Sequence, residues 1–90
     1  MIALEISLNG HVIAIAGAED QLVLNAIIGV VRSKDNSEDF HSHVGGLIED
    51  NQSDDPKHFS YPIPKPKLGD EFRIRVVNVE PSELSPPETA

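Results

Sequence analysis

Four histidines carry the most versatile side chains of this chain, and two of them are spaced for joint use. His41 and His43 are separated by one residue, so on an extended strand both imidazoles lie on the same face. His58 or His11 could add a third ligand, because imidazole is a common ligand of zinc. A metal site needs three or four converging ligands, and two surface histidines on an edge strand explain the same spacing. His41, His43 and His58 are therefore the candidate metal ligands, and we expect no metal and no cofactor.

The carboxylates gather in three stretches of the sequence. These are Asp35, Glu38 and Asp39; Glu49, Asp50, Asp54 and Asp55; and Glu80, Glu83 and Glu88. Neighbouring acids could serve acid–base catalysis or hold Ca²⁺, but the ligand spacing of a calcium loop is absent. Solvated loops are the simpler interpretation. The alternative is that these acids imitate nucleic-acid phosphates or bind a basic partner.

Nucleophilic chemistry has no recognisable motif. Ser42 and Ser60 lie near histidines in the sequence, but no nucleophile elbow or triad signature surrounds them. The Gly45-Gly46 pair lacks the lysine and hydroxyl residue of a phosphate-binding loop. The chain has no cysteine, so thiolate chemistry and disulfides are excluded. We predict a protein that is not an enzyme.

Length and charge narrow the class of partner. The chain has 90 residues, enough for one domain, and a formal net charge of −8. This charge disfavours nonspecific binding to DNA, RNA or an anionic membrane. Neither a signal peptide nor an apolar run long enough to cross a bilayer is visible. We expect a cytoplasmic protein whose partner is another protein.

The first seventeen residues, MIALEISLNGHVIAIAG, predict a β-hairpin. Apolar residues alternate with small or polar ones from Ile2 to Leu8, the period of a half-buried strand. Asn9-Gly10 supplies the two positive-φ positions of a type I′ turn. With that turn, the apolar residues of both strands share one face. The expected pairs are Leu8 with His11, Ile6 with Ile13, and Leu4 with Ile15.

The segment 20–36 supports two interpretations. Asp20 is a good helix N-cap, and positive charge at Arg32 and Lys34 suits a helix C-terminus that ends near Asn36. Apolar residues at helical spacing complete this pattern, and they are Leu24, Ile27, Ile28 and Val31. The β-branched residues and Gly29 favour a buried strand instead. We predict a helix and keep the strand as the alternative.

The second half of the chain predicts three extended segments. In 39–50, Phe40, Ser42 and Val44 share one face, and Gly45-Gly46 suggests a bulge or tight bend. Residues 49–57 are predicted to be an exposed loop, and 58–63 a short extended piece. The alternating prolines of 62–67 make a stiff connector into a final strand at 71–79. We expect one domain over residues 1–80 and a flexible tail over 81–90.

This order predicts an α+β fold: a mixed sheet (ββαβββ) with one helix packed across one face and the final strand in its middle. The opening MIALEISLNGHVIAIA, the predicted helix and the closing LGDEFRIRVV resemble the β-grasp, or ubiquitin-like, superfamily. The chain is also similar to small uncharacterised bacterial proteins with an LNG hairpin, a VGGL segment and a GDE turn.

The resemblance implies a non-enzymatic module that binds another protein through its open sheet face or an edge strand. The partner-binding residues expected on that face are Val12, Ala14, Arg73, Arg75 and Val77. Edge-strand pairing could also form a homodimer. One alternative is an acidic inhibitor or immunity-type protein that blocks a nucleic-acid-binding enzyme. Another is a ubiquitin-like modifier that needs C-terminal processing, since the one diglycine, Gly45-Gly46, is internal.

Overall fold

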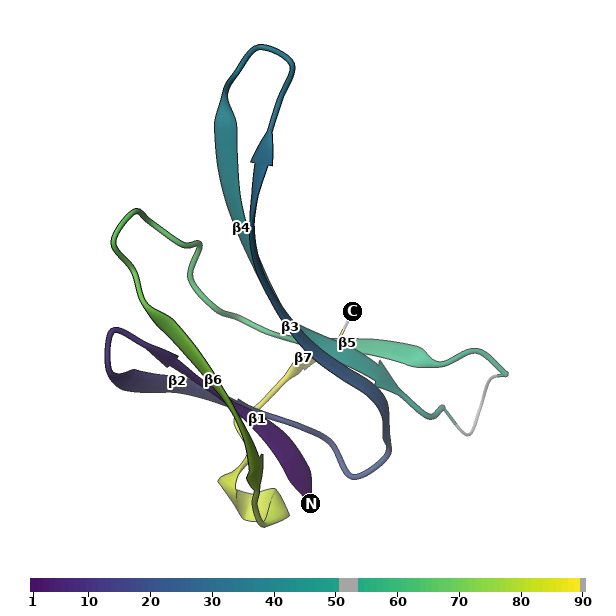
Figure 1. Ribbon diagram of the computed structural model, residues 1–90. Helices are drawn as coiled ribbons and strands as arrows, with labels where there is room; N and C mark the ends of the chain where they lie inside the picture. Colours follow the sequence, from purple (N-terminus) through teal and green to yellow (C-terminus); the bar gives the residue numbers. More distant parts are fainter. Residues whose placement is uncertain (51–53, 90) are drawn as a thin grey trace.

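Residues 1–50 and 54–89 of a computed structural model are described, and they form two antiparallel sheets (Figure 1). The first sheet has the order β2 (His11–Ala16), β1 (Ile2–Leu8), β6 (Phe72–Asn78). The second has the order β3 (Gln21–Arg32), β4 (Glu38–Ile48), β5 (Lys57–Tyr61), β7 (Glu88–Thr89). A single 3₁₀ turn, η1 (Pro81–Glu83), is the one helical element within the described ranges. The inner faces of the two sheets share one apolar core.

The predicted helix and the β-grasp arrangement are wrong. Residues 21–32 form β3, and no α-helix occurs in the described part of the chain. The final strand β6 does not lie in the middle of a mixed sheet. It is an outer strand, antiparallel to the central β1. The β-branched residues of 20–36 decide the outcome, because their side chains pack better on a pleated strand than on a helix.

The predicted β1–β2 turn forms, but the register of the two strands changes after the first two pairs. Asn9 and Gly10 have φ of 50° and 87°, as a type I′ turn requires, and Leu8 pairs with His11. A bulge then makes Ile13 the extra residue of β2. The pairs beyond it are Ile6 with Ala14 and Leu4 with Ala16. The bulge therefore turns alanines toward the core, where Ile13 and Ile15 were expected.

The core is small, and aromatic side chains from β5 fill much of it. Its buried members are Ile6, Ala14, Ala16, Val44, Phe59 and Tyr61. Phe59 and Tyr61 meet edge to face with their ring centroids 6.0 Å apart. Ala14 and Ala16 leave room for these rings because each has a single methyl group. The small residues of β2 and the large residues of β5 are complementary in volume.

The Tyr61 hydroxyl joins the two sheets inside the core. It donates a hydrogen bond to the carbonyl oxygen of Gly17 at 2.8 Å and accepts one from the Gly17 amide at 3.0 Å. Gly17 directly follows β2, whereas Tyr61 ends β5. One buried side chain thus satisfies both backbone groups of a residue that no strand ladder includes.

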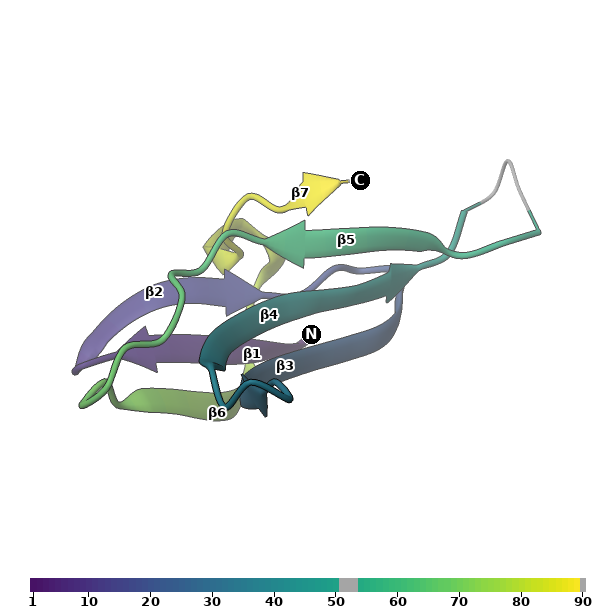
Figure 2. The ribbon, with the colours of Figure 1, turned by 90° about the horizontal axis from the view of Figure 1, so that it is seen from above.

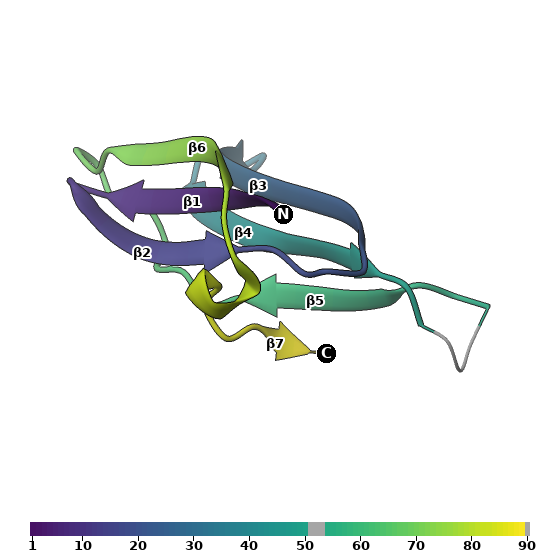
Figure 3. The same ribbon diagram turned by 90° about the horizontal axis from the view of Figure 1, so that it is seen from below.

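The C-terminal segment makes specific contacts with both sheets. Ser85 donates its amide to the carbonyl of Ile15 and accepts the Ile15 amide on its hydroxyl, each at 2.9 Å. Beyond it, β7 pairs with the free side of β5 (Figure 3). The segment expected to be a flexible tail therefore covers the β2 edge of one sheet and the β5 edge of the other.

The opposite side of the sandwich is uncovered. Figures 2 and 3 show β3 and β6 on the side away from β7, and each is the last strand of its sheet. The outer half of the β3–β4 hairpin also extends beyond the rest of the sandwich (Figure 1). Strands β3 and β6 therefore each have a neighbouring strand on one side only.

Candidate functional site

Strand β3 exposes large apolar side chains along most of its length. We call this set the β3 patch: Leu22, Val23, Ile27, Ile28, Val30 and Val31. Each member is between 37% and 57% exposed. Exposed single apolar residues are ordinary on protein surfaces, but six large ones on one strand of twelve residues are not.

Both faces of β3 contribute to the patch. Leu24 and Ala26 pack against the core, but Ile28 and Val30, further along the same face, are 37% and 56% exposed. On the other face, Ile27 and Val31 are 48% and 54% exposed. The overhang of the hairpin explains the exposure of Ile28 and Val30, because β3 extends past the edge of the first sheet before its apolar residues end. Ile27 and Val31 lie on the outer face of the second sheet.

The backbone of β3 also presents an unused edge. A three-residue loop with Asn36 at φ 67° closes the hairpin, and Ser33 donates its amide to the carbonyl of Ser37 at 2.9 Å. In an antiparallel ladder, bonded and non-bonded positions alternate. The N–H and C=O groups of Ala26, Ile28 and Val30 therefore point away from β4, toward solvent.

The two exposed edge strands differ in how they discourage pairing. Edge strands are normally protected by charge, proline or a covering segment. On β6, Arg73 and Arg75 place two positive charges two residues apart. From Gln21 to Val31, β3 has neither a charged residue nor a proline. The β3 edge is the unprotected one.

Polar contacts hold the outer half of the hairpin. The Lys65 ammonium lies 2.9 Å from the Asp39 carboxylate, and this bond lowers the pKa of Asp39. The Ser42 hydroxyl donates to the carbonyl of Pro64 at 3.0 Å. At the tip, the Asp35 carboxylate accepts the Ser37 hydroxyl at 2.6 Å, which lowers the pKa of Asp35. The proline-rich connector thus supports the hairpin.

The partner-binding face expected from the sequence is only partly assembled. Register places Val12, Arg73, Arg75 and Val77 on the outer face of the first sheet. Ala14, expected beside them, is 4% exposed and faces the core, because the bulge at Ile13 reverses its direction. The expected pairing of Glu5 with an arginine occurs at 3.5 Å from Arg75. Such pairs are ordinary on an exposed sheet face.

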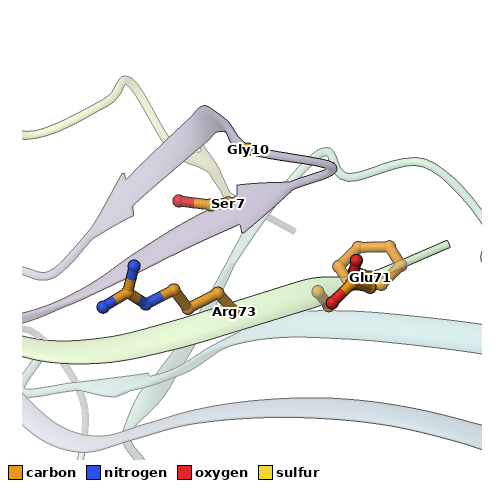
Figure 4. A pocket seen from close by; sticks show the side chains of 5 residues that line it. Ser7, Gly10, Glu71 and Arg73 are labelled. Carbon is orange, nitrogen blue, oxygen red and sulfur yellow. The ribbon is translucent and has the colours of Figure 1, made fainter.

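A hollow of about 450 Å³ lies at one end of this outer face (Figure 4). Its lining includes Ser7, Glu71 and Arg73. Figure 4 shows Arg73 directed away from Glu71, toward the opposite end of the hollow. Ser7 is 8% exposed, and no histidine that could activate its hydroxyl lines the hollow. The lining has no arrangement for nucleophilic catalysis.

The candidate histidines do not converge. His41 lies over Gly29, with its ring Cε1 only 2.6 Å from where a Cβ on Gly29 would be. His43 pairs across the ladder with Ile27, and His58 with Leu47. Four residues of strand, about 13 Å, separate the positions of His43 and Leu47. Among residues 1–50 and 54–89, no three His, Cys, Asp or Glu side chains are grouped to hold a metal.

Two of the three acidic clusters lie at opposite ends of β4, and the third belongs to the C-terminal segment. Asp35, Glu38 and Asp39 are at the hairpin tip, whereas Glu49 follows the far end of the strand. The eleven residues of β4 keep the two clusters about 33 Å apart. An imitation of nucleic-acid phosphates by one continuous acidic surface therefore has no support in this arrangement.

A second polar cluster joins the β1–β2 turn to the entry of β6. Asn9 and Glu71 exchange two hydrogen bonds of 2.9 Å, from the Asn9 amide to the Glu71 carbonyl and from the Glu71 amide to Asn9 Oδ1. Asn9 Nδ2 donates to Asp70 at 3.1 Å, and the Lys67 amide does so at 2.8 Å. These donors favour the charged carboxylate and lower the pKa of Asp70, the Asn9 amide being the largest cause.

We expect this cluster to make the first sheet sensitive to acid. Because folding lowers the pKa of Asp70, its stabilisation is present above the ordinary carboxyl pKa and is lost as pH falls through the lowered value. An NMR pH titration of Asn9→Ala should show the pKa of Asp70 raised toward its ordinary value. Asp35, bonded to Ser37 instead, serves as the internal control. An unchanged Asp70 would contradict the role given to Asn9.

No protein-family model, curated protein or solved structure matches this chain. Within the described ranges, no helix is long and apolar enough to span a membrane. The function of the candidate site is therefore inferred from the geometry of this chain.

Sequence reasoning missed the β3 patch because it assigned this segment to a helix with one buried stripe. The signal that could have found it was the run of β-branched residues on both faces of the alternative strand.

Proposed function

We propose that this protein is a non-enzymatic protein-binding module and that β3 is its contact strand. The observation that carries the proposal is the combination of an uncharged, unpaired backbone edge with apolar side chains exposed on both faces of the same strand. Either feature alone is common. Together they match the requirements for adding a partner strand to a sheet.

Physical chemistry explains why both features are needed. Backbone hydrogen bonds along an added strand give affinity with little sequence preference, and side chains above and below the strand supply selectivity. Burial of apolar surface contributes roughly 25 cal/mol per Å² removed from water. A partner strand beside β3 would cover Ile27 and Val31 on one face and Ile28 and Val30 on the other.

The outer face of the first sheet is the weaker contact surface. Arg75 is engaged by Glu5, and Ala14 has turned into the core. The β6 edge beside it carries alternating arginines that oppose strand addition. The function expected from the sequence, binding of another protein, is retained in this proposal, but its surface moves to the second sheet.

A pair of valine substitutions tests the proposal. Val30→Lys places a charge within the β3 patch, and Val76→Lys makes the same change on the other exposed edge strand. These residues are 56% and 72% exposed, so neither substitution disturbs the core. Native affinity capture and cross-linking should lose the partner with Val30→Lys, by roughly tenfold or more in Kd. Val76→Lys should bind as the unmodified protein does.

Circular dichroism and thermal unfolding of both variants confirm that the fold is intact before binding is compared. Equal binding by Val30→Lys and the unmodified chain would overturn the proposal. Loss of binding with Val76→Lys alone would also overturn it and would return the contact surface to the first sheet.

A further inference from the structure

We propose that the strand added to β3 is the β3 strand of a second copy of this chain, paired antiparallel about a two-fold axis. The inference rests on the proposed function, since it requires β3 to be the contact strand. Two copies joined in this way form one sheet that runs from β7 of one copy through both β3 strands to β7 of the other.

The charges at the two ends of β3 favour this arrangement. Glu19 and Asp20 directly precede the strand, whereas Arg32 ends it and Lys34 follows. Antiparallel pairing places the start of one β3 beside the end of the other. Each basic end then lies against an acidic end, twice in every dimer, because a two-fold interface repeats each contact. A parallel arrangement would instead oppose like charges.

The middle of β3 is compatible with self-pairing as well. Beyond the bulge at Leu22, the outward-pointing backbone groups belong to even-numbered residues, including Ala26, Ile28 and Val30. Placing Ile28 of one copy opposite Ala26 of the other therefore joins two hydrogen-bonding positions. In this register Val30 faces Leu24 and Arg32 faces Leu22, so the end of one strand at Arg32 borders the bulged start of the other strand, which Glu19 and Asp20 precede. From Val23 to Val31, every pair in this register joins apolar, glycine or amide residues.

Three acids also lie at the hairpin tip, and Asp35, the one in the loop beside Lys34, bonds Ser37. Glu38 and Asp39 belong to β4, one strand away, and Asp39 is held by Lys65. Arg32 pairs across the hairpin with Glu38 but stands on the strand that borders the second copy. The net charge of −8 on each copy opposes association over longer distances. The test must therefore separate local complementarity from global repulsion.

Charge-reversal variants make that separation, and sedimentation equilibrium with native mass spectrometry measures it. Arg32→Glu with Lys34→Glu makes both ends of β3 acidic. Glu19→Lys with Asp20→Lys makes both ends basic. Each variant should self-associate about tenfold more weakly than the unmodified chain, because like charges then meet. An equimolar mixture should form the heterodimer at least as tightly as the unmodified chain forms its dimer.

Net charge alone predicts a different pattern. The lysine variant is less negative than the unmodified chain, so weaker global repulsion would strengthen its self-association. Arg73→Glu with Arg75→Glu changes net charge as the acidic β3 variant does, but on the β6 edge. We expect it to associate more tightly than that variant. Circular dichroism of each variant establishes that it is folded.

The outcomes separate this inference from the proposed function. A dimer weakened by both β3 variants and restored in their mixture supports the antiparallel pair. An unmodified chain that stays monomeric to millimolar concentration overturns the second-copy inference. If such a monomer still binds another protein in a way that Val30→Lys abolishes, the proposed function stands. If neither a dimer nor a Val30-dependent partner is found, both are overturned.

Discussion

Gly46→Ala is expected to destabilise this protein more than any other single-methyl addition to β4. A Cβ at Gly46 would overlap the carbonyl oxygen of Val23 and lie 3.1 Å from the Cα of Leu24. Both obstacles are backbone atoms of β3, so no rotamer change relieves them, and the strands must separate. We expect a loss of about 3 kcal/mol or more, a large share of the 5–15 kcal/mol typical of small domains.

Urea denaturation of Gly46→Ala beside Gly29→Ala measures this effect. Gly29 lies in the same hairpin, but an added Cβ there meets only the imidazole of His41, at 2.6 Å from Cε1. That ring is the end of a flexible side chain and can rotate away. Gly29→Ala should therefore change the free energy of unfolding by less than about 1 kcal/mol. Equal losses in the two variants would contradict the close approach of β3 and β4 at Gly46.

Tyr61→Phe is the second large expected effect, although it deletes one oxygen atom. The amide and carbonyl of Gly17 both lose their hydrogen-bond partner in the core, while the aromatic ring and its packing stay. An unsatisfied buried polar group costs about 1–3 kcal/mol, and here one substitution creates two. We expect the free energy of unfolding to fall by about 2–4 kcal/mol.

The control for Tyr61→Phe is Ser42→Ala, which also removes one hydroxyl that bonds a backbone carbonyl. The Ser42 bond to Pro64 is exposed, so water replaces it, and we expect a change within about 0.5 kcal/mol. Hydrogen exchange at Gly17 provides a second readout, because its amide should exchange faster in Tyr61→Phe. An unchanged exchange rate together with unchanged stability would contradict the link between the sheets.

The β1–β2 hairpin shows which features of a hairpin sequence patterns predict and which they do not. Strict alternation and Asn9-Gly10 correctly indicate two strands, their turn and the first pair. They cannot show the bulge at Ile13, which depends on the space left by Phe59 and Tyr61 from a distant part of the chain. A one-residue slip reverses every later side chain. The prediction for Ala14 is wrong for this reason.

The error at β3 has a different cause. A strand that is apolar on both faces has apolar residues at nearly every spacing, including the three- and four-residue spacing of a helix. Periodicity then no longer distinguishes a helix from a strand, and the β-branched residues with Gly29 are the better indication of a strand. The face pattern of β4 was easier, since Val44 is buried while His41 and His43 are exposed, as their alternation indicates.

The candidate site could not be predicted because it depends on strand order. Which strand ends a sheet is decided by pairings between distant segments, such as β1 with β6 and β5 with β7. The sequence does indicate that β3 lacks charge and that β6 carries alternating arginines. Only the topology shows that β3 and β6 are both edge strands, so that the arginines protect the β6 edge and nothing comparable protects the β3 edge.

Pairing between β1 and β6 also has a kinetic consequence. The partners Ile2 and Asn78 lie at opposite ends of the chain, and such non-local contacts slow folding. The β3–β4 hairpin is local and can form early, so its apolar edge is available while the first sheet is still incomplete. Intramolecular closure then competes with encounters between chains. The yield of refolded protein should fall as chain concentration rises, and Val30→Lys should reduce that dependence.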